Sequence, residues 1–175
     1  MPESVAVNVR GRSYKILADI EITDPNASGV IFAHGSRFGG HSLFLKDKKL
    51  YYVYNFLGIP PEQKFVSPDL KPGKYTLGME FTRESAGKFH ESVGKTKLYV
   101  NDKVVAEGPM RAQVGKFTLC GDGLCVGFDS ADAVSQEYQG SNPFQGGKIL
   151  GVGVTVEKAQ YLDLEKLAAA AFSVD

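Results

Sequence analysis

Apolar and polar residues alternate in short segments along most of the chain, with the period of two that half-buried antiparallel strands require. In residues 14–22, one face carries Tyr14, Ile16, Ala18, Ile20 and Ile22, and the other face is mostly polar. Residues 75–81 repeat this pattern. Further strands are predicted over residues 30–34, 42–46, 50–56, 96–101, 104–107, 117–119, 124–128 and 149–157.

The residues between these segments are typical of tight turns. Asp47-Lys48, Asn101-Asp102 and Gly121-Asp122-Gly123 each separate two predicted strands, which indicates hairpins and antiparallel pairing. Crossover helices for parallel strands are missing from the pattern. The sequence therefore predicts an all-β, two-sheet antiparallel sandwich, with ordered surface loops over 57–72 and 130–147. Because residues 50–56 are apolar on both faces, that strand should be central or covered by a loop.

One helix is predicted, over residues 162–173. Asp163 is a suitable N-cap, and the alanine run that follows has high helix propensity. Leu164, Leu167 and Ala171 share a stripe, so we expect the helix to dock on the rim of the sandwich or on a partner. The length of 175 residues fits a single domain over 1–175.

The composition excludes some classes of binding partner. Twenty basic residues balance twenty acidic ones, so no global field attracts nucleic acid or an anionic membrane. No apolar run approaches the roughly 20 residues that span a bilayer, and the first residues do not form a signal peptide. We expect no nucleic-acid partner and no membrane partner, and a cytoplasmic location by default.

The segment 34–41 is the most informative candidate site. It holds His34, Ser36, Arg37 and His41 among three glycines, which let a backbone approach a ligand closely. Two imidazoles and a guanidinium form a plausible anion site, whereas two histidines without a carboxylate fall short of a zinc set. The alternative is structural: the glycines make a wide turn and the histidines hydrogen-bond to neighbouring strands.

A tyrosine-rich strand offers a second candidate, since aromatic faces stack on sugar rings and planar amides bind hydroxyls. The candidates on this strand are Tyr51, Tyr52, Tyr54 and Asn55. The chain contains no Trp, the usual stacking residue of such modules. Tyrosines of a central strand are otherwise core residues.

Three acids suggest a structural calcium ion at the sandwich rim. Asp122, Asp129 and Asp132 lie close in sequence, with glycine and serine between them. The alternative is that these carboxylates are solvated turn residues. No other cofactor is expected.

The chain shows no complete catalytic site. A laminarinase-type strand needs three carboxylates on one face, and residues 17–21 supply Asp19 and Glu21 but place Leu17 where the nucleophile belongs. We therefore expect that the chain is not an enzyme. A small enzyme of unknown reaction, built on the 34–41 segment, is a remaining alternative.

Several of these strands resemble a known fold. The successions over 42–47, 49–55, 74–81 and 97–102 look like the laminin-G and concanavalin A-like jelly roll. Residues 144–149 are similar to the penultimate turn of such modules. The resemblance implies that the last strand, 149–157, returns beside the first, 14–22.

More narrowly, residues 29–41, 52–56, 123–127 and 161–165 resemble the C-terminal, non-catalytic region of bacterial arylsulfatases. The formylglycine motif Cys-x-Pro-x-Arg of a sulfatase is not formed around Cys120 or Cys125. The resemblance implies an accessory domain that packs on a sulfatase catalytic domain or associates with itself. The alternative is a glycan-binding module that recognises sulfated saccharides through His34, Arg37 and His41.

Overall fold

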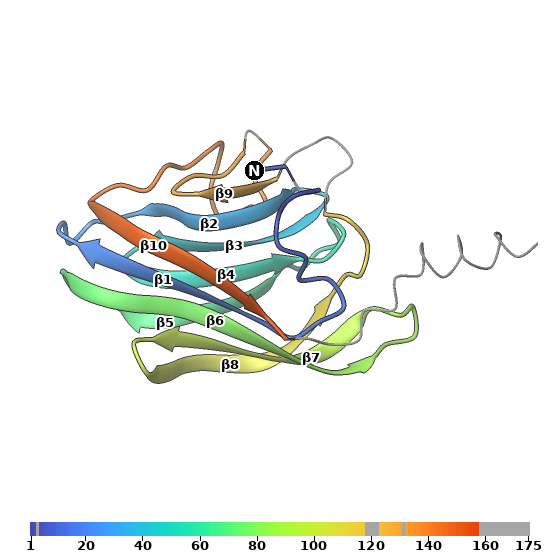
Figure 1. Cartoon of the computed structure of the whole chain (residues 1–175). Coiled ribbons are helices and arrows are strands. Elements are labelled where there is room, and N and C mark those ends of the chain that lie inside the picture. Colours follow the sequence, from blue (N-terminus) through green and yellow to red (C-terminus); the bar gives the residue numbers. More distant parts are fainter. Residues whose placement is uncertain (3, 118–122, 131, 158–175) are drawn as a thin grey trace, which may run out of the picture.

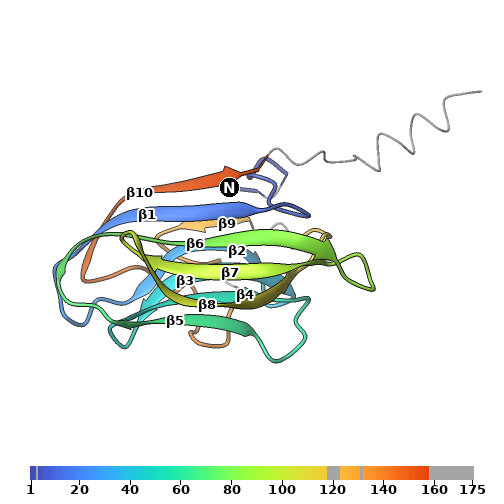
Figure 2. The same ribbon diagram turned by 90° about the horizontal axis from the view of Figure 1, so that it is seen from below.

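The computed structural model describes residues 1–2, 4–117, 123–130 and 132–157, which form two antiparallel five-stranded sheets packed face to face (Figure 1). The first sheet has the order β10-β1-β6-β7-β8, and the second has the order β5-β4-β3-β2-β9. Figure 2 shows the first sheet in front, with β10 and β8 on opposite sides. The strands are β1 (Tyr14–Ile22), β2 (Gly29–Ser36), β3 (Gly39–Lys46), β4 (Lys49–Asn55), β5 (Gln63–Asp69), β6 (Gly73–Ala86), β7 (Ser92–Val100), β8 (Lys103–Ala112), β9 (Leu124–Val126) and β10 (Gly147–Val156).

This architecture confirms the predicted all-β sandwich and its closing strand. Strand β10 pairs antiparallel with β1, and Val156 lies opposite Tyr14. The β3–β4 hairpin turns at Asp47 and Lys48, which have φ angles of 49° and 64°. These left-handed values are those of the two-residue turn that matches the twist of paired strands.

Three predicted elements differ from the structure or fall on residues that the structure does not describe. Strand β5 occupies part of the predicted loop 57–72. Its Pro68 weakened the strand signal, but an edge strand tolerates a proline because one side of its backbone needs no partner. Phe117 lies in a bend rather than a strand, while residues 118–119 and the predicted helix 162–173 lie outside the described residues.

The expected loop over 34–41 is instead a tight hairpin. Strand β2 continues to Ser36 and β3 begins at Gly39, so His34 and His41 lie directly opposite each other. Gly35 and Gly40 form the next pair, where the two backbones approach closely. A Cβ atom on Gly35 would lie 2.3 Å from the carbonyl oxygen of Gly39, which is shorter than any real contact. The glycines therefore allow the pairing to continue to the turn.

The middle strands of the second sheet are buried on both faces. Between the sheets lies the main core, to which β1, β4 and β6 contribute large apolar side chains. On the outer face, Phe44 and Val53 pack against Val134 and Tyr138 of the segment that follows β9. This cover explains why β4 is apolar on both faces, and it confirms the prediction of a covering loop.

The two sides of the sandwich differ. On one side β5 meets β8: Gln63 Nε2 donates to the Arg111 carbonyl, and the Arg111 amide donates to Gln63 Oε1, both at 2.8 Å. On the other side no backbone hydrogen bond joins β9 to β10 among the described residues. We call these the closed side and the open side. No helix in the described part of the chain is long and apolar enough to cross a membrane.

Candidate ligand-binding site

A pocket of about 430 Å³, lined by both polar and apolar residues, lies at the rim of the sandwich next to β4 and β5. Three segments form its walls: the β2–β3 turn, the β4–β5 connection and the segment after β9. We call it the Arg37 pocket. Its lining residues are Arg37, Asn55, Gly58, Ile59, Pro60, Pro61, Glu62, Lys64 and the run 133–137.

The side chain of Asn55 holds the three walls together. Its Nδ2 donates to the carbonyl oxygens of Arg37 and Val134, both at 2.9 Å. Its Oδ1 accepts the amide of Gly58, also at 2.9 Å. Asn55 ends β4 and is buried, so these bonds are made in a protected environment. Because its amide hydrogens are both used, Asn55 shapes the pocket rather than offering donors to a ligand.

Arg37 provides the most exposed cation among the residues that line the pocket. It sits in the β2–β3 turn, and its side chain is 69% exposed. Its Nε contacts Asp132 Oδ1 at 2.8 Å, which orients the guanidinium plane. No hydrogen bond of the Arg37 side chain occurs among the described residues, and because the side chain is largely exposed its terminal N–H groups are accessible. Such a fork matches the geometry of a carboxylate or a sulfate.

The two glutamates of the pocket are engaged in internal contacts. Glu62 accepts bonds from the Ser135 hydroxyl and the Gln136 amide, both at 2.8 Å. Glu137 contacts Lys46 at 2.8 Å and also binds Lys64. Hydrogen bonds from these two lysines lower the pKa of Glu137. The acidic side chains thus stabilise the wall 132–137, and Glu137 shares its single negative charge between Lys46 and Lys64.

An exposed apolar rim borders the pocket. Phe38 is 65% exposed, and Leu57 and Ile59 are each about half exposed. The turns that carry them touch, because a Cβ atom on Gly58 would lie 3.0 Å from the Arg37 carbonyl oxygen. The Phe38 ring also lies 5.2 Å from the Arg37 guanidinium carbon. A cation and an apolar surface are therefore adjacent at this rim.

Of the residues selected from sequence, the structure brings together Arg37, Asn55 and Asp132. His34, His41 and Tyr54 lie elsewhere, in the interior between the sheets. His41 Nδ1 lies 3.0 Å from the Tyr52 hydroxyl, and burial lowers the pKa of His41 well below its ordinary value. Both imidazoles are buried, whereas the Arg37 side chain is largely exposed, so the three groups do not share one accessible surface in this structure.

The remaining selected polar groups stabilise local structure. The Tyr54 hydroxyl accepts the Gln113 amide at 2.9 Å. Ser36 is buried, and its hydroxyl oxygen accepts the Phe38 amide at 3.3 Å. These contacts fit the structural alternative for the segment 34–41.

The three aspartates of the calcium hypothesis have different surroundings. Asp129 is buried and accepts bonds from the Ser130 and Val134 amides and from the Tyr138 hydroxyl. Asp132 pairs with Arg37, and Asp122 lies outside the described residues. Within the described ranges, no three His, Cys, Asp or Glu residues gather into a group suited to a metal ion. The calcium site stays a prediction.

Sequence reasoning missed Glu62, Lys64, Ser135 and Glu137. They fall in two segments that were expected to be loops, where hydrophobic periodicity says nothing about neighbours in space. Only long-range contacts, such as that of Ser135 with Glu62, bring the two segments together.

Comparisons with known proteins identify the fold. No protein-family model matches the chain, and no curated protein matches it. Among solved structures, it is similar to the mouse laminin α1 chain, domains LG4-5, with a TM-score of 0.57 and 14% identity over 90% of this chain and 40% of that one. It thus spans less than half of that laminin structure.

A second similar structure is the CBM40 of Ruminococcus gnavus IT-sialidase bound to α2,3-sialyllactose. The TM-score is 0.53 at 16% identity, and the match covers 90% of this chain and 82% of that one. A further structure of this CBM40 has a TM-score of 0.55 at 14% identity, covering 91% and 83%. The two antiparallel sheets described above are therefore a jelly-roll sandwich of the laminin-G and CBM40 kind.

Proposed function

We propose that this chain is a non-catalytic binding module that takes an acidic saccharide in the Arg37 pocket. The single observation that carries the proposal is the guanidinium of Arg37, which is largely exposed at the pocket and oriented by Asp132. Its free N–H groups suit a carboxylate or a sulfate ester, and both occur on acidic sugars.

The surroundings of Arg37 support this choice of ligand. Both glutamates of the pocket are engaged with internal donors, so they are poorly placed to bind sugar hydroxyls or to exchange protons with a substrate. Phe38, Leu57 and Ile59 provide an apolar rim for the less polar face of a pyranose ring. The pocket therefore combines the exposed Arg37 and the partly exposed Lys64 with an apolar edge, and both glutamates among its described residues already have internal partners.

The comparison with the sialidase module adds support at the level of the fold. That module was solved with α2,3-sialyllactose, an acidic saccharide, on the same kind of sandwich. At 16% identity the likeness concerns the fold, so the ligand of this chain rests on the Arg37 pocket itself.

The proposal also concerns the larger protein in which the module acts. The resemblance of residues 29–41 and 52–56 to the C-terminal region of bacterial arylsulfatases suggests that it acts beside a sulfatase catalytic domain. In that setting the Arg37 pocket would hold a sulfated saccharide near the catalytic centre. Sequence resemblance alone supports this part, and a sulfated ligand is its specific expectation.

Calorimetric titration tests the proposal with three probes: 3′-sialyllactose, a sulfated chondroitin disaccharide and uncharged lactose. We expect binding of one or both acidic probes and no heat with lactose. Arg37→Ala should weaken binding by about tenfold or more, since a charge-assisted bond contributes about 1.5–3 kcal/mol. Arg83→Ala, an exposed arginine on β6 in the other sheet, is the matched control and should bind like the original chain.

The outcomes separate the parts of the proposal. Preference for the chondroitin probe supports the sulfatase context, whereas preference for sialyllactose contradicts that context and keeps the acidic-saccharide function. Equal binding of lactose, or an Arg37→Ala variant with unchanged affinity, would overturn the function.

A further inference from the structure

Among the strands of the described residues, β10 pairs only with β1 and has no partner on its other edge. It forms the end of its sheet and runs for 10 residues. Natural proteins usually protect such edges with charges, prolines or a covering segment. Between Lys148 and Glu157, β10 contains neither a charged residue nor a proline. Gly151 and Gly153 add no side chains, and the space where a Cβ atom would lie is open at both.

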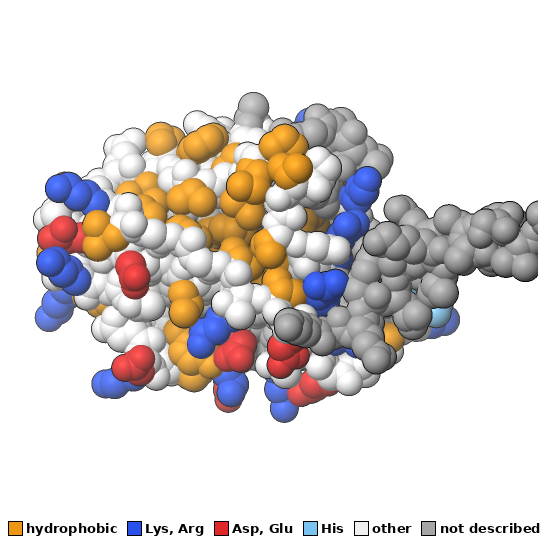
Figure 3. All heavy atoms as spheres, in the orientation of Figure 1, with side chains coloured by type: hydrophobic (Ala, Val, Ile, Leu, Met, Phe, Trp, Pro, Cys, Tyr) orange, Lys and Arg blue, Asp and Glu red, His pale blue; other side chains and the backbone are white. Residues whose placement is uncertain are grey.

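The surface around this edge is apolar. Leu150 is 64% exposed, and Val126 and Phe128 on the open side are each nearly half exposed. Figure 3 shows hydrophobic side chains gathered over the middle and upper part of this face, in the region of β1 and β10, with charged side chains around the periphery. On the closed side, by contrast, Gln63 joins β5 to β8.

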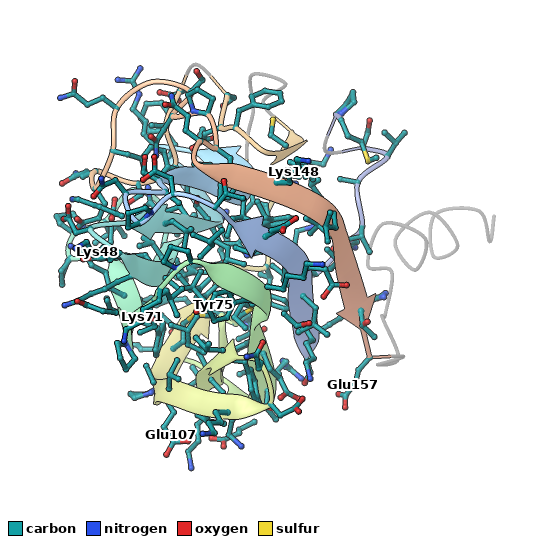
Figure 4. The ribbon with its side chains drawn as sticks, turned by 90° about the vertical axis from the view of Figure 1, so that its left-hand side faces the viewer. Lys48, Lys71, Tyr75, Glu107, Lys148 and Glu157 are labelled. Atoms are coloured by element: carbon teal, nitrogen blue, oxygen red, sulfur yellow. The ribbon has the colours of Figure 1, made fainter. Side chains whose placement is uncertain are left out.

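Two opposite charges mark the ends of the strand. Lys148 lies at the beginning of β10 and Glu157 directly after its end, and both are exposed (Figure 4). Neither takes part in an ion pair between described residues. Two antiparallel copies of β10 would place the lysine of each beside the glutamate of the other.

We propose that β10 pairs with β10 of a second copy of this chain, about a two-fold axis at Gly153. In this register Gly153 faces itself, Val152 faces Val154, and Lys148 faces Glu157. The β1–β10 pairing skips Leu150, because Asp19 lies opposite Gly151 and Ile20 opposite Ile149. This extra residue brings Lys148 one position nearer to Gly153, so that it comes opposite Glu157 and not opposite residue 158. The two sheets join into one, and both exposed edges are satisfied.

This inference is independent of the proposed saccharide site. The Arg37 pocket adjoins β4 and β5, whereas β10 borders the open side beside β9. Dimerisation through β10 therefore leaves both Arg37 pockets accessible, and a dimer would present two of them to a repeating polysaccharide.

Sedimentation velocity of the full chain over a concentration series tests the proposal, with circular dichroism to confirm folding. The original chain should form a dimer that dissociates on dilution. Lys148→Glu and Glu157→Lys should each weaken the dimer by about tenfold, because each replaces two attractive pairs with repulsive ones. The double variant Lys148→Glu/Glu157→Lys restores the pairs and should restore the dimer. Lys103→Glu, at the start of β8, is the control and should leave the dimer unchanged.

A second variant tests the backbone pairing directly. Val154→Pro removes an amide that points away from β1, next to the centre of the proposed interface, and should give a folded monomer. A chain that stays monomeric at high micromolar concentration would overturn the proposal. A dimer that tolerates both single charge reversals would also overturn it, because that dimer would use another surface.

Discussion

The base and the tip of the β2–β3 hairpin are separated by only a few residues, yet they have opposite roles. At the base, His34 and His41 face each other in the interior, surrounded by Tyr14, Phe32 and Phe117. At the tip, Arg37 is exposed and binds Asp132. The hairpin runs from the interior of the sandwich to its rim. Residues of one polar, glycine-rich segment can therefore belong either to the core or to the binding site.

The base of the hairpin also fixes the position of the tip. The glycine pair lets the two strands stay in register up to the turn, and the Ser36 hydroxyl accepts the Phe38 amide within the turn. The base therefore positions Arg37 without contacting a ligand. Substitutions at the base should change stability, and substitutions at the tip should change binding.

The largest effect is expected at the base from Gly35→Ala. Its φ angle of 112° is unfavourable for alanine, and the added Cβ atom would clash with the Gly39 carbonyl oxygen. Strain and overpacking together should lower the free energy of unfolding by about 3–5 kcal/mol. Urea denaturation measures this change. Gly115→Ala, where nothing lies within 4 Å of the new atom, is the matched control and should change stability by less than about 0.5 kcal/mol.

Asn55→Ala should have the next largest effect, because it connects the hairpin tip to the rest of the fold. The variant loses three hydrogen bonds and leaves the carbonyl oxygens of Arg37 and Val134 without this donor. We expect a loss of about 2–3 kcal/mol in the free energy of unfolding. We also expect weaker saccharide binding, because the walls lose their common anchor. Wild-type stability would show that Asn55 does not hold the walls.

The protonation of His41 should give a smaller effect that depends on pH. Burial lowers its pKa below the ordinary value of 6.5, so the unfolded chain binds a proton more readily than the folded chain. Stability is complete above pH 6.5 and falls as the pH drops below it, by up to about 1.4 kcal/mol per pH unit for this residue.

Urea denaturation at several pH values measures this slope. His41→Gln should flatten it, whereas His90→Gln, in an exposed turn, should keep the original slope. An unchanged slope in His41→Gln would contradict the assignment to the base of the hairpin.

The smallest change in stability is expected at the tip, from Phe38→Ala. Because the ring is mostly exposed, the free energy of unfolding should change by less than about 0.5 kcal/mol. If Phe38 contacts the saccharide, calorimetry should show affinity falling by about three- to tenfold. Phe89→Ala removes another mostly exposed ring, in the β6–β7 turn, and should leave affinity unchanged. Equal affinities for the two variants would limit the site to Arg37 and its polar neighbours.

Much of the fold follows from periodicity. The alternation in residues 14–22 defines β1 with its observed ends, and the resemblance to jelly rolls correctly placed β10 beside it. Strand β5 escaped prediction because its Pro68 and charged neighbours are typical of a loop, and only its position at an edge makes them acceptable.

The candidate site was less predictable. Arg37 was selected because it lies in a glycine-rich segment, and Asn55 because amides bind sugar hydroxyls, although its observed role is to join the walls. The histidines were attractive for the same chemistry, but a buried imidazole and an exposed one look identical in sequence. Glu62 and Glu137 depend on contacts between distant segments, which no local pattern encodes.

The linkage made by Asn55 has a consequence for the speed of recognition. Since one buried amide fixes all three walls, a sugar meets a site whose shape already exists, and no wall has to close over it. Association should then be limited by diffusion and orientation, and differences in affinity among sugars should reside in how long each one stays bound.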